Sequence, residues 1–290
     1  MSNSANEAIK VSVLSMATNF ILAAFKLFAG IFSHSAAMIS DAVHSASDVV
    51  STIVVIVGIK ISEKEPDEEH PYGHERMECV AALILAAMLA AVGVGIGKTG
   101  LESIMSGDYK TKAVPGVVAL AAALVSILVK EFMFQLTMRT AKRVNSSALK
   151  ADAWHHRSDA LSSIGALVGI VGAMLGFGVT DVIASLVICL FILKASFDVF
   201  VDGVNGMVDH AVEESLLEEI RTVIIHERGV VKIDELKSRR FGAKIYIDVE
   251  ISVDGNLSLF EAHEIAEDVH DVIEAKFPDI KHCMVHENPA

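Results

Sequence analysis

The sequence has few cysteines, few basic residues and few charges overall, and each shortage excludes a class of protein. Its three cysteines lie far apart and form no CxxC pair, so neither a disulfide framework nor a thiolate metal cluster is available. Its 24 lysines and arginines face 37 aspartates and glutamates, and a formal charge of −13 disfavours nucleic-acid binding. No GxxxxGK[ST] loop is present, so the phosphate cradle of a nucleotide-driven pump is missing.

Apolar residues are abundant instead, at 52% of the chain, against 21% charged residues. The mean hydropathy of +0.50 is too high for an ordinary soluble domain. Six apolar stretches are each long enough to cross a hydrocarbon layer of ~30 Å as a helix. They cover residues 9–32, 36–61, 79–104, 114–138, 149–177 and 180–207. We therefore expect residues 1–208 to form a membrane domain, an all-α six-helix transmembrane bundle.

Charged residues in the connections predict how this bundle is oriented. Most loop lysines and arginines lie between the second and third stretches and between the fourth and fifth. Because basic loops stay on the cytoplasmic side, both termini of this multi-pass protein are expected in the cytoplasm.

The chain changes character after residue 210. Between residues 211 and 290, 18 acidic side chains face 9 basic ones, so this part holds −9 of the net −13. Periodicity predicts a helix over 213–227, strands over 230–239 and 243–253, a helix over 258–276 and a strand over 280–287. This αββαβ order predicts a cytoplasmic α+β domain with a ferredoxin-like sheet over residues 209–290.

Two apolar stretches contain the same motif, His-x-x-x-Asp, as His44/Asp48 and His155/Asp159. Residues four apart share one helix face, so two facing helices would bring two imidazoles and two carboxylates together. A charge at mid-bilayer costs roughly 2.5 to 3.5 kcal/mol, so these carboxylates need a counter-ion. Mixed nitrogen and oxygen ligands favour Zn²⁺ over Mg²⁺ or Ca²⁺. The alternative is that the four residues form polar contacts between helices.

Two neighbours of the motif have different expected roles. Asp41 shares the face of His44 and either orients its second ring nitrogen or lines the entry route; both alternatives stay open. His156 lies off the face of His155 and Asp159, and we expect it not to be a ligand.

These features resemble the cation diffusion facilitators, divalent-metal/proton antiporters with six transmembrane helices and a cytoplasmic ferredoxin-like domain. The resemblance covers nearly the whole chain, and histidine with aspartate on both helices is similar to the zinc-transporting branch. It implies a secondary active transporter rather than an enzyme: a homodimeric Zn²⁺/H⁺ antiporter that exports cytoplasmic zinc without an organic cofactor. Residues 139–150 lack the long His-rich loop of many animal and plant relatives, which favours a bacterial plasma membrane protein.

The connection between the second and third stretches resembles a second site of this family. Asp67, His70 and His74 lie within eight residues around a Pro-Tyr-Gly turn, and together they would hold an ion with an open ligand position. The alternative is a solvated acidic loop with incidental histidines. The resemblance also implies an interlock between Arg76 and Asp209 that holds the dimer together where the two domains meet.

The acidic tail departs further from the family. Positions at which better-known zinc members bind metal are occupied here by Asp234, Asp248, His263, His286 and Asn288. Two histidines have become aspartates and the final aspartate an asparagine, which leaves two alternatives, a binuclear zinc site or a dimerisation module without tight metal binding. Of the other histidines, His226 and His270 are expected to be solvated, and no partner is assigned to His34 or His282.

Charge counting suggests how transport is coupled. Asp48 and Asp159 contribute −2, which either one Zn²⁺ or two protons on His44 and His155 would neutralise. Because a ligating imidazole must be deprotonated, metal and protons compete for the same nitrogens. The resemblance implies that the first, second, fourth and fifth helices rock against the other two. The alternatives are a Mn²⁺, Cd²⁺ or Fe²⁺ exporter of the same family, a metal-gated channel and a membrane metal sensor.

Overall fold

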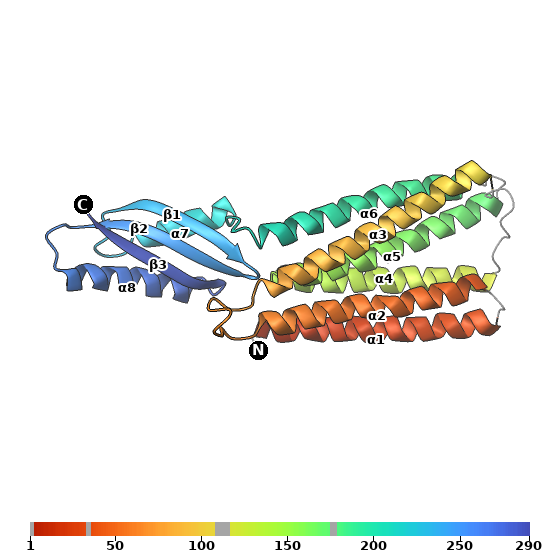
Figure 1. Cartoon of the computed structure of the whole chain (residues 1–290), viewed down its shortest axis with the longest axis horizontal. Helices are drawn as coiled ribbons and strands as arrows, with labels where there is room; N and C mark the ends of the chain where they lie inside the picture. Colours follow the sequence, from red (N-terminus) through yellow and green to blue (C-terminus); the bar gives the residue numbers. More distant parts are fainter. Residues whose placement is uncertain (1–2, 33–35, 108–116, 175–178) are drawn as a thin grey trace. The chain divides into compact units, whose positions relative to one another are not determined.

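The structure is a computed structural model that describes residues 3–32, 36–107, 117–174 and 179–290. By its internal contacts the chain divides into two units, Met1–Gly203 and Val204–Ala290. The first is helical and the second combines helices with a sheet (Figure 1).

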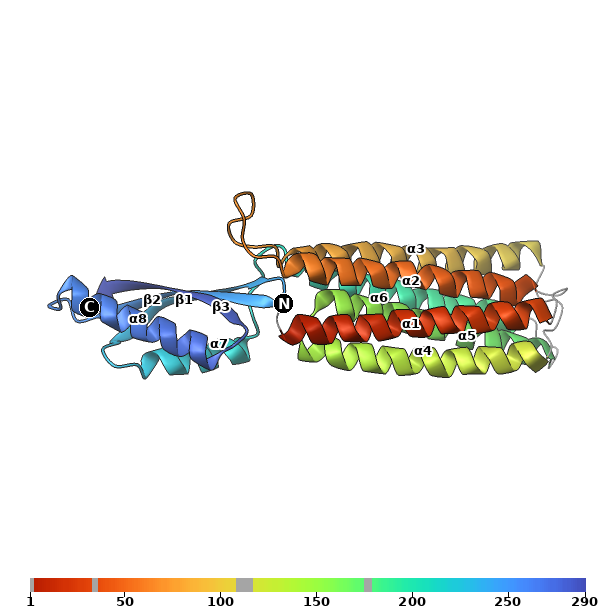
Figure 2. The same cartoon turned by 90° about the horizontal axis from the view of Figure 1, so that it is seen from below.

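Within the described residues, the helical unit contains six long helices that run alongside one another (Figures 1 and 2). Their lengths of 27 to 30 residues correspond to about 40 to 45 Å at ~1.5 Å per residue, enough to cross a bilayer. They are α1 (Asn3–Phe32), α2 (Ala36–Ser62), α3 (Met77–Ser106), α4 (Val117–Arg143), α5 (Ser147–Met174) and α6 (Val179–Asn205). Each overlaps one of the apolar stretches in the sequence.

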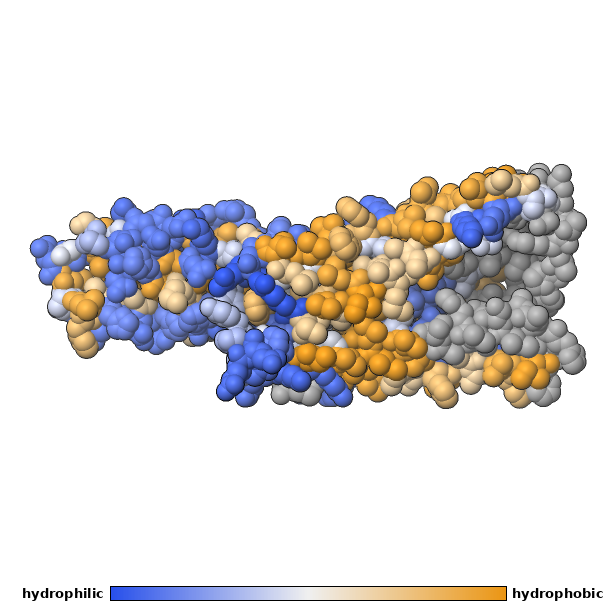
Figure 3. Space-filling view, in the orientation of Figure 1, coloured by the Kyte–Doolittle hydropathy of each residue, from blue (hydrophilic) through white to orange (hydrophobic). Residues whose placement is uncertain are grey.

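The outer surface of this unit is apolar. Phe20, Ile21, Leu128, Phe132 and Leu190 are 66 to 71% exposed, and Figure 3 shows such surface over the helices. A patch of this extent matches a lipid environment. By length and hydropathy, two helices of the described chain qualify as membrane spans, α1 over Asn3–Phe28 and α3 over its full length. The prediction of six spans goes beyond this finding.

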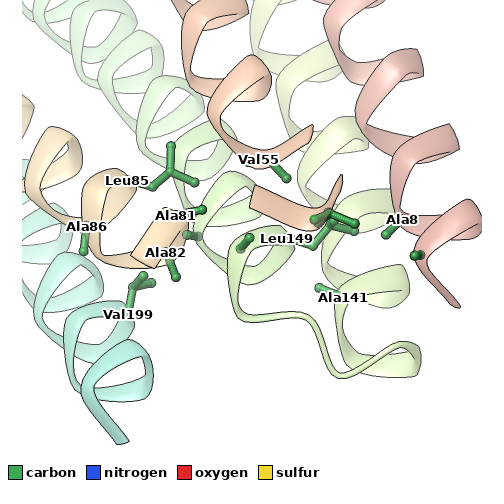
Figure 4. Packing of buried hydrophobic residues seen from close by; sticks show 13 residues of the cluster. Ala8, Val55, Ala81, Ala82, Leu85, Ala86, Ala141, Leu149 and Val199 are labelled. Carbon is green, nitrogen blue, oxygen red and sulfur yellow. The ribbon is translucent and has the colours of Figure 1, made fainter. Parts of the chain in front are cut away.

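Small residues let the helices approach closely. A buried cluster joins all six helices through mainly alanine side chains, with Val55 of α2, Leu149 of α5 and Val199 of α6 among them (Figure 4). A Cβ atom at Gly58 of α2 would lie 2.4 Å from the Cβ atom of Ala81 in α3, so only glycine fits this crossing. The contacts place α2 against α1, α3 and α5, and α4 against α1 and α5.

Buried polar side chains gather on four of the six helices. In the described part of the bundle, α3 and α6 contribute only Glu78 and Ser196 to this set. The others lie on α1, α2, α4 and α5: Ser12, Ser15, Asn19, Lys26, Asp48, Ser51, Thr52, Ser62, Ser126, Lys130, Thr137, Thr140, Ser146, Asp152, His155, His156, Ser158 and Asp159, counting Ser146 just before α5. The interior between these four helices is therefore polar, as a path for ions requires.

The second unit has the predicted element order. It consists of α7 (Glu214–Ile225), β1 (Lys232–Phe241), β2 (Lys244–Val253), α8 (Leu259–Lys276) and β3 (Ile280–Pro289). The sheet order is β1-β2-β3, with β1 and β2 antiparallel and β2 and β3 parallel. Alternate residues of β2, from Ile245 to Val253, form a core with α7 and α8, which cover one face of the sheet (Figure 2).

Candidate metal sites

Three of the four predicted intramembrane ligands lie together where α2 meets α5. One potential ligand atom each from Asp48, His155 and Asp159 lies within 4.8 Å of the other two. His155 Nε2 is 3.3 Å from Asp48 Oδ1 and 4.0 Å from Asp159 Oδ2, and these side chains are 2 to 8% exposed. The side chains of His44 and Asp41 lie outside the described residues. The backbone places His44 in α2, one helical turn before Asp48.

A fourth side chain enters this group from α4, and the sequence analysis missed it. Lys130 Nζ donates hydrogen bonds to Asp48 Oδ2 at 2.6 Å and to Asp159 Oδ2 at 2.7 Å, and the lysine side chain is 2% exposed. Its ammonium group therefore lies between the two carboxylates that were predicted to hold a metal ion. The signal that would have revealed it is an ionisable residue inside an apolar stretch, which is costly unless it is paired.

Lys130 changes the charge count of the site. Two carboxylates and one ammonium sum to −1 rather than −2 when the imidazole is neutral. The ammonium already supplies part of the counter-charge that the sequence analysis assigned to metal or protons.

His156 faces a different neighbour from His155. Its Nε2 atom lies 2.5 Å from Ser15 Oγ of α1 and 3.5 Å from Asp152 Oδ2, and its side chain is fully buried. This direction, toward α1, agrees with the expectation that His156 does not share the ligand face of His155 and Asp159.

The three predicted loop residues between α2 and α3 also come together. Asp67 Oδ1 is 3.2 Å from His70 Nδ1, and Asp67 Oδ2 is 3.3 Å from His74 Nε2. Backbone N–H groups of Glu69 and His70 donate to Asp67 Oδ1 at 3.1 and 2.7 Å, which fixes the carboxylate in the turn. The hydrogen bond from the His70 N–H is the main cause that lowers the pKa of Asp67, so this carboxylate stays ionised.

Of the five predicted positions of the α/β unit, Asp234 and Asn288 lie in hydrogen-bond contact with each other. Asp234 accepts hydrogen bonds from Ser252 Oγ at 2.6 Å and Asn288 Nδ2 at 3.4 Å, and it pairs with Lys232. His263 is exposed on α8, 3.6 Å from Glu267. Over the described chain, no close group of three His, Cys, Asp or Glu side chains includes Asp234, Asp248, His263 or His286. A site at these positions remains a prediction.

A third group of potential ligands lies elsewhere in the α/β unit. His270, Glu274 and His282 offer ligand atoms within 4.8 Å of one another. The expectation that His270 is merely solvated and that His282 has no assignable partner was therefore wrong. The spacing of His270 and Glu274 on one helix face was readable from the sequence, but the third member comes from a strand.

The predicted interlock involves both units. Arg76 precedes the first residue of α3, and Asp209 lies in the second unit with a φ angle of 57°. Their pairing remains a prediction.

Comparisons with known proteins agree with the two-part organisation. Residues 12–208 match the family model of the cation efflux transmembrane domain, and residues 212–290 match that of the cation efflux protein cytoplasmic domain. The manganese efflux system protein MneP of Bacillus subtilis (strain 168) is 33% identical over 287 residues, which cover 97% of this chain and 95% of that protein. Metal tolerance protein C1 of Arabidopsis thaliana is 35% identical over 299 residues, which cover 98% of this chain and 63% of that protein.

A magnetosome protein is a third relative. MamB of Magnetospira sp. (strain QH-2) is 31% identical over 265 residues, covering 91% of this chain and 89% of that protein. With both domains matched and relatives aligned over nearly its full length, the chain belongs to the cation efflux family, the cation diffusion facilitators, which are membrane transporters of divalent metal cations.

Proposed function

We propose that this protein is a Zn²⁺/H⁺ antiporter that exports cytoplasmic zinc by alternating access. The observation that carries the proposal is the buried group of Asp48, His155 and Asp159, in which two helices contribute ligands to one point. Family membership accounts for metal efflux, whereas the identity of the ion and the exchange for protons are the proposal.

The donor atoms support zinc. One imidazole nitrogen and two carboxylates are present, and His44 would add a second nitrogen from α2. Such mixed sets suit Zn²⁺, at roughly 2.0 to 2.2 Å from each ligand atom. Manganese is the second candidate ion, because the MneP protein that shares 33% of its residues with this chain is named for manganese efflux. Two carboxylates also suit Mn²⁺.

Lys130 makes metal binding an exchange of cations. A divalent ion at the two carboxylates would face the ammonium at close range, and the repulsion amounts to about 4 kcal/mol for each pair of unit charges 4 Å apart. The ammonium therefore swings away on its flexible stem when zinc arrives. After zinc leaves, the ammonium returns and pairs with both carboxylates, so the bundle never holds two unpaired carboxylates at this site.

Protons enter the same exchange through histidine. A zinc-bound imidazole must be deprotonated, so zinc binding at His155 releases any proton held there, and zinc release allows a proton to return. Access would alternate by movement of α1, α2, α4 and α5 relative to α3 and α6. The polar interior between the first four helices supports this division.

The remaining parts of the proposal concern the surroundings of the site. We place both termini in the cytoplasm of a bacterial cell, and two copies of the chain in a homodimer through the ferredoxin-like domain. The loop group of Asp67, His70 and His74 would capture ions near the entrance, since two of its side chains are 54% exposed.

Flux and internal pH, recorded together in proteoliposomes, test this function. A zinc gradient should drive zinc across the membrane with proton movement in the opposite direction, and manganese should give a smaller response. Zinc flux without a pH change would indicate a metal-gated channel. Zinc binding without flux would indicate a membrane sensor, and faster manganese flux would indicate a manganese exporter.

A further inference from the structure

We propose that His270, Glu274 and His282 form a binding site for a divalent transition-metal cation in the cytoplasmic domain. His270 and Glu274 lie one turn apart on α8, and His282 lies near the start of β3. The site shares no residue with the intramembrane group, the loop group or the five tail positions suggested by the family resemblance. It does not depend on which ion the transmembrane domain moves.

The backbone of Cys283 orients His270 as a ligand. His270 Nδ1 lies 2.7 Å from the carbonyl oxygen of Cys283. Because a carbonyl oxygen only accepts, Nδ1 carries the proton, and Nε2 of the neutral ring presents a lone pair. Histidines that bind metals commonly donate their other N–H group in this way.

The same residue orients Glu274. The Cys283 N–H group donates to Glu274 Oε1 at 3.1 Å, which fixes the carboxylate oxygen. That oxygen faces His270 Nε2 at 3.3 Å and His282 Nδ1 at 3.5 Å. When both imidazoles present a lone pair here, as metal binding requires, they repel the carboxylate oxygen, and a cation shared by all three would stabilise the arrangement.

Local backbone structure brings β3 into this position. Ile280 and His282 pair with the consecutive residues Ile245 and Tyr246 of β2, so Lys281 is an extra residue in the strand. Such β-bulges redirect side chains and are frequent beside functional sites. Buried Val269 and Ile273 hold the same turn of α8 on the sheet. The ligands thus come from a packed helix and a paired strand, which favours a preorganised site.

Exposure and donor type indicate the class of ligand. The three side chains are 31 to 46% exposed, so water can complete the coordination. Two imidazoles and one carboxylate are a ligand set of zinc sites with an open position, whereas Mg²⁺ and Ca²⁺ prefer oxygen alone. The thiol of Cys283 is buried in the domain core and is not available as a ligand. The surplus of acidic residues in this domain attracts cations to it.

Zinc stoichiometry of the full-length protein tests the site. After equilibrium dialysis of detergent-solubilised protein against buffered Zn²⁺, His270→Ala and His282→Ala should each bind one zinc fewer per chain, or bind it at least about tenfold more weakly. His226→Ala is the matched control, because His226 is also exposed in this domain and its Nδ1 contacts a backbone oxygen, that of Thr222, at 2.7 Å. Equal zinc content in all three variants would overturn the proposal.

Two further variants keep the result interpretable. Glu274→Gln retains an acceptor for the Cys283 N–H group but removes the charge, so it should weaken zinc binding while the far-ultraviolet circular dichroism stays unchanged. Unaltered zinc affinity in this variant would also count against the site. Asp159→Ala should retain this ion although it stops transport, so zinc flux in Asp159→Ala would contradict only the proposed function.

Discussion

The buried group in the bundle and the exposed group in the α/β unit have the same types of ligand but opposite surroundings. Asp48, His155 and Asp159 are 2 to 8% exposed, and an ammonium group lies between their carboxylates. The group of His270, Glu274 and His282 is 31 to 46% exposed and is oriented by backbone groups. A buried carboxylate pair requires a cation at all times, whereas an exposed carboxylate is stabilised by water.

This difference predicts two modes of metal binding. At the buried group, a metal ion would bind only when the Lys130 ammonium leaves, so binding there would be an exchange that suits transport. At the exposed group, a metal ion would displace water, so binding there would be simple occupancy that suits a resident ion. The predictions below test this distinction.

The largest expected effect is at the buried group. Asp159→Ala removes a carboxylate that contacts Lys130 and belongs to the proposed ligand set, so zinc flux and zinc-driven proton movement should fall by on the order of a hundredfold or more. Glu102→Ala, a carboxylate that is 65% exposed on α3, should keep wild-type flux in the same proteoliposome assay. Robust exchange in Asp159→Ala would defeat the assignment of this residue.

Removal of the Lys130 ammonium group should change zinc affinity and maximal zinc flux in opposite directions. In Lys130→Gln, zinc no longer competes with an ammonium, so its affinity for the buried group should rise about tenfold while the maximal flux falls, because release loses its replacement cation. Lys130→Arg keeps the positive charge, so its zinc affinity and maximal flux should lie closer to those of the wild type. A lower melting temperature with unchanged zinc affinity would reduce Lys130 to a structural role.

The nitrogen content of the buried group should decide selectivity. His44→Asp replaces one of the two proposed nitrogen donors with oxygen, so manganese or cadmium should pass more readily, with the zinc-to-manganese flux ratio falling by about tenfold. Competition between the two ions in proteoliposomes measures the ratio. An unchanged preference would count against His44 as a ligand.

The loop group should have a smaller effect, on capture rather than on turnover. His74→Ala should raise the zinc concentration needed for half-maximal flux a few-fold, about 0.5 to 1 kcal/mol, with little change in the maximal rate. Because the hydrogen bond from the His70 N–H lowers the pKa of Asp67, acidification should not remove this ligand within the ordinary carboxylate range. A large loss of maximal rate would instead place the loop in the transport path.

The smallest expected effect concerns the predicted interlock. Arg76→Asp should weaken the dimer by about 1 kcal/mol or less, as expected of a partly exposed pair, and the added change Asp209→Arg should restore it. Dimer dissociation in detergent, followed by sedimentation, measures both. If the dimer of the double variant dissociates as readily as that of Arg76→Asp alone, the two residues do not pair.

Much of the fold follows from patterns that are local in the sequence. Long apolar runs predicted all six helices of the bundle. Helix α1 begins earlier than predicted, at Asn3 rather than near residue 9, because its first two turns are polar and an apolar run does not mark them. The order of helices and strands in the tail also agrees with the period of its apolar residues. The convergence of Asp48 with His155 and Asp159 followed from identical motif spacing on two helices.

Side chains that act across distant elements were not predictable in the same way. Lys130 lies on a third helix, and no spacing relates it to Asp48 or Asp159, so only its position within an apolar stretch marked it as unusual. His282 reaches Glu274 through the pairing register of β3 and the bulge at Lys281, and neither is visible in the local sequence pattern.

An experimental structure of the zinc-loaded protein tests the account most directly. It should contain an ion bound by Asp48, His155 and Asp159 at roughly 2.0 to 2.2 Å from each ligand atom, with the Lys130 ammonium moved away from both carboxylates. Zinc bound elsewhere in the bundle, or Lys130 still bridging Asp48 and Asp159 beside a bound ion, would contradict it.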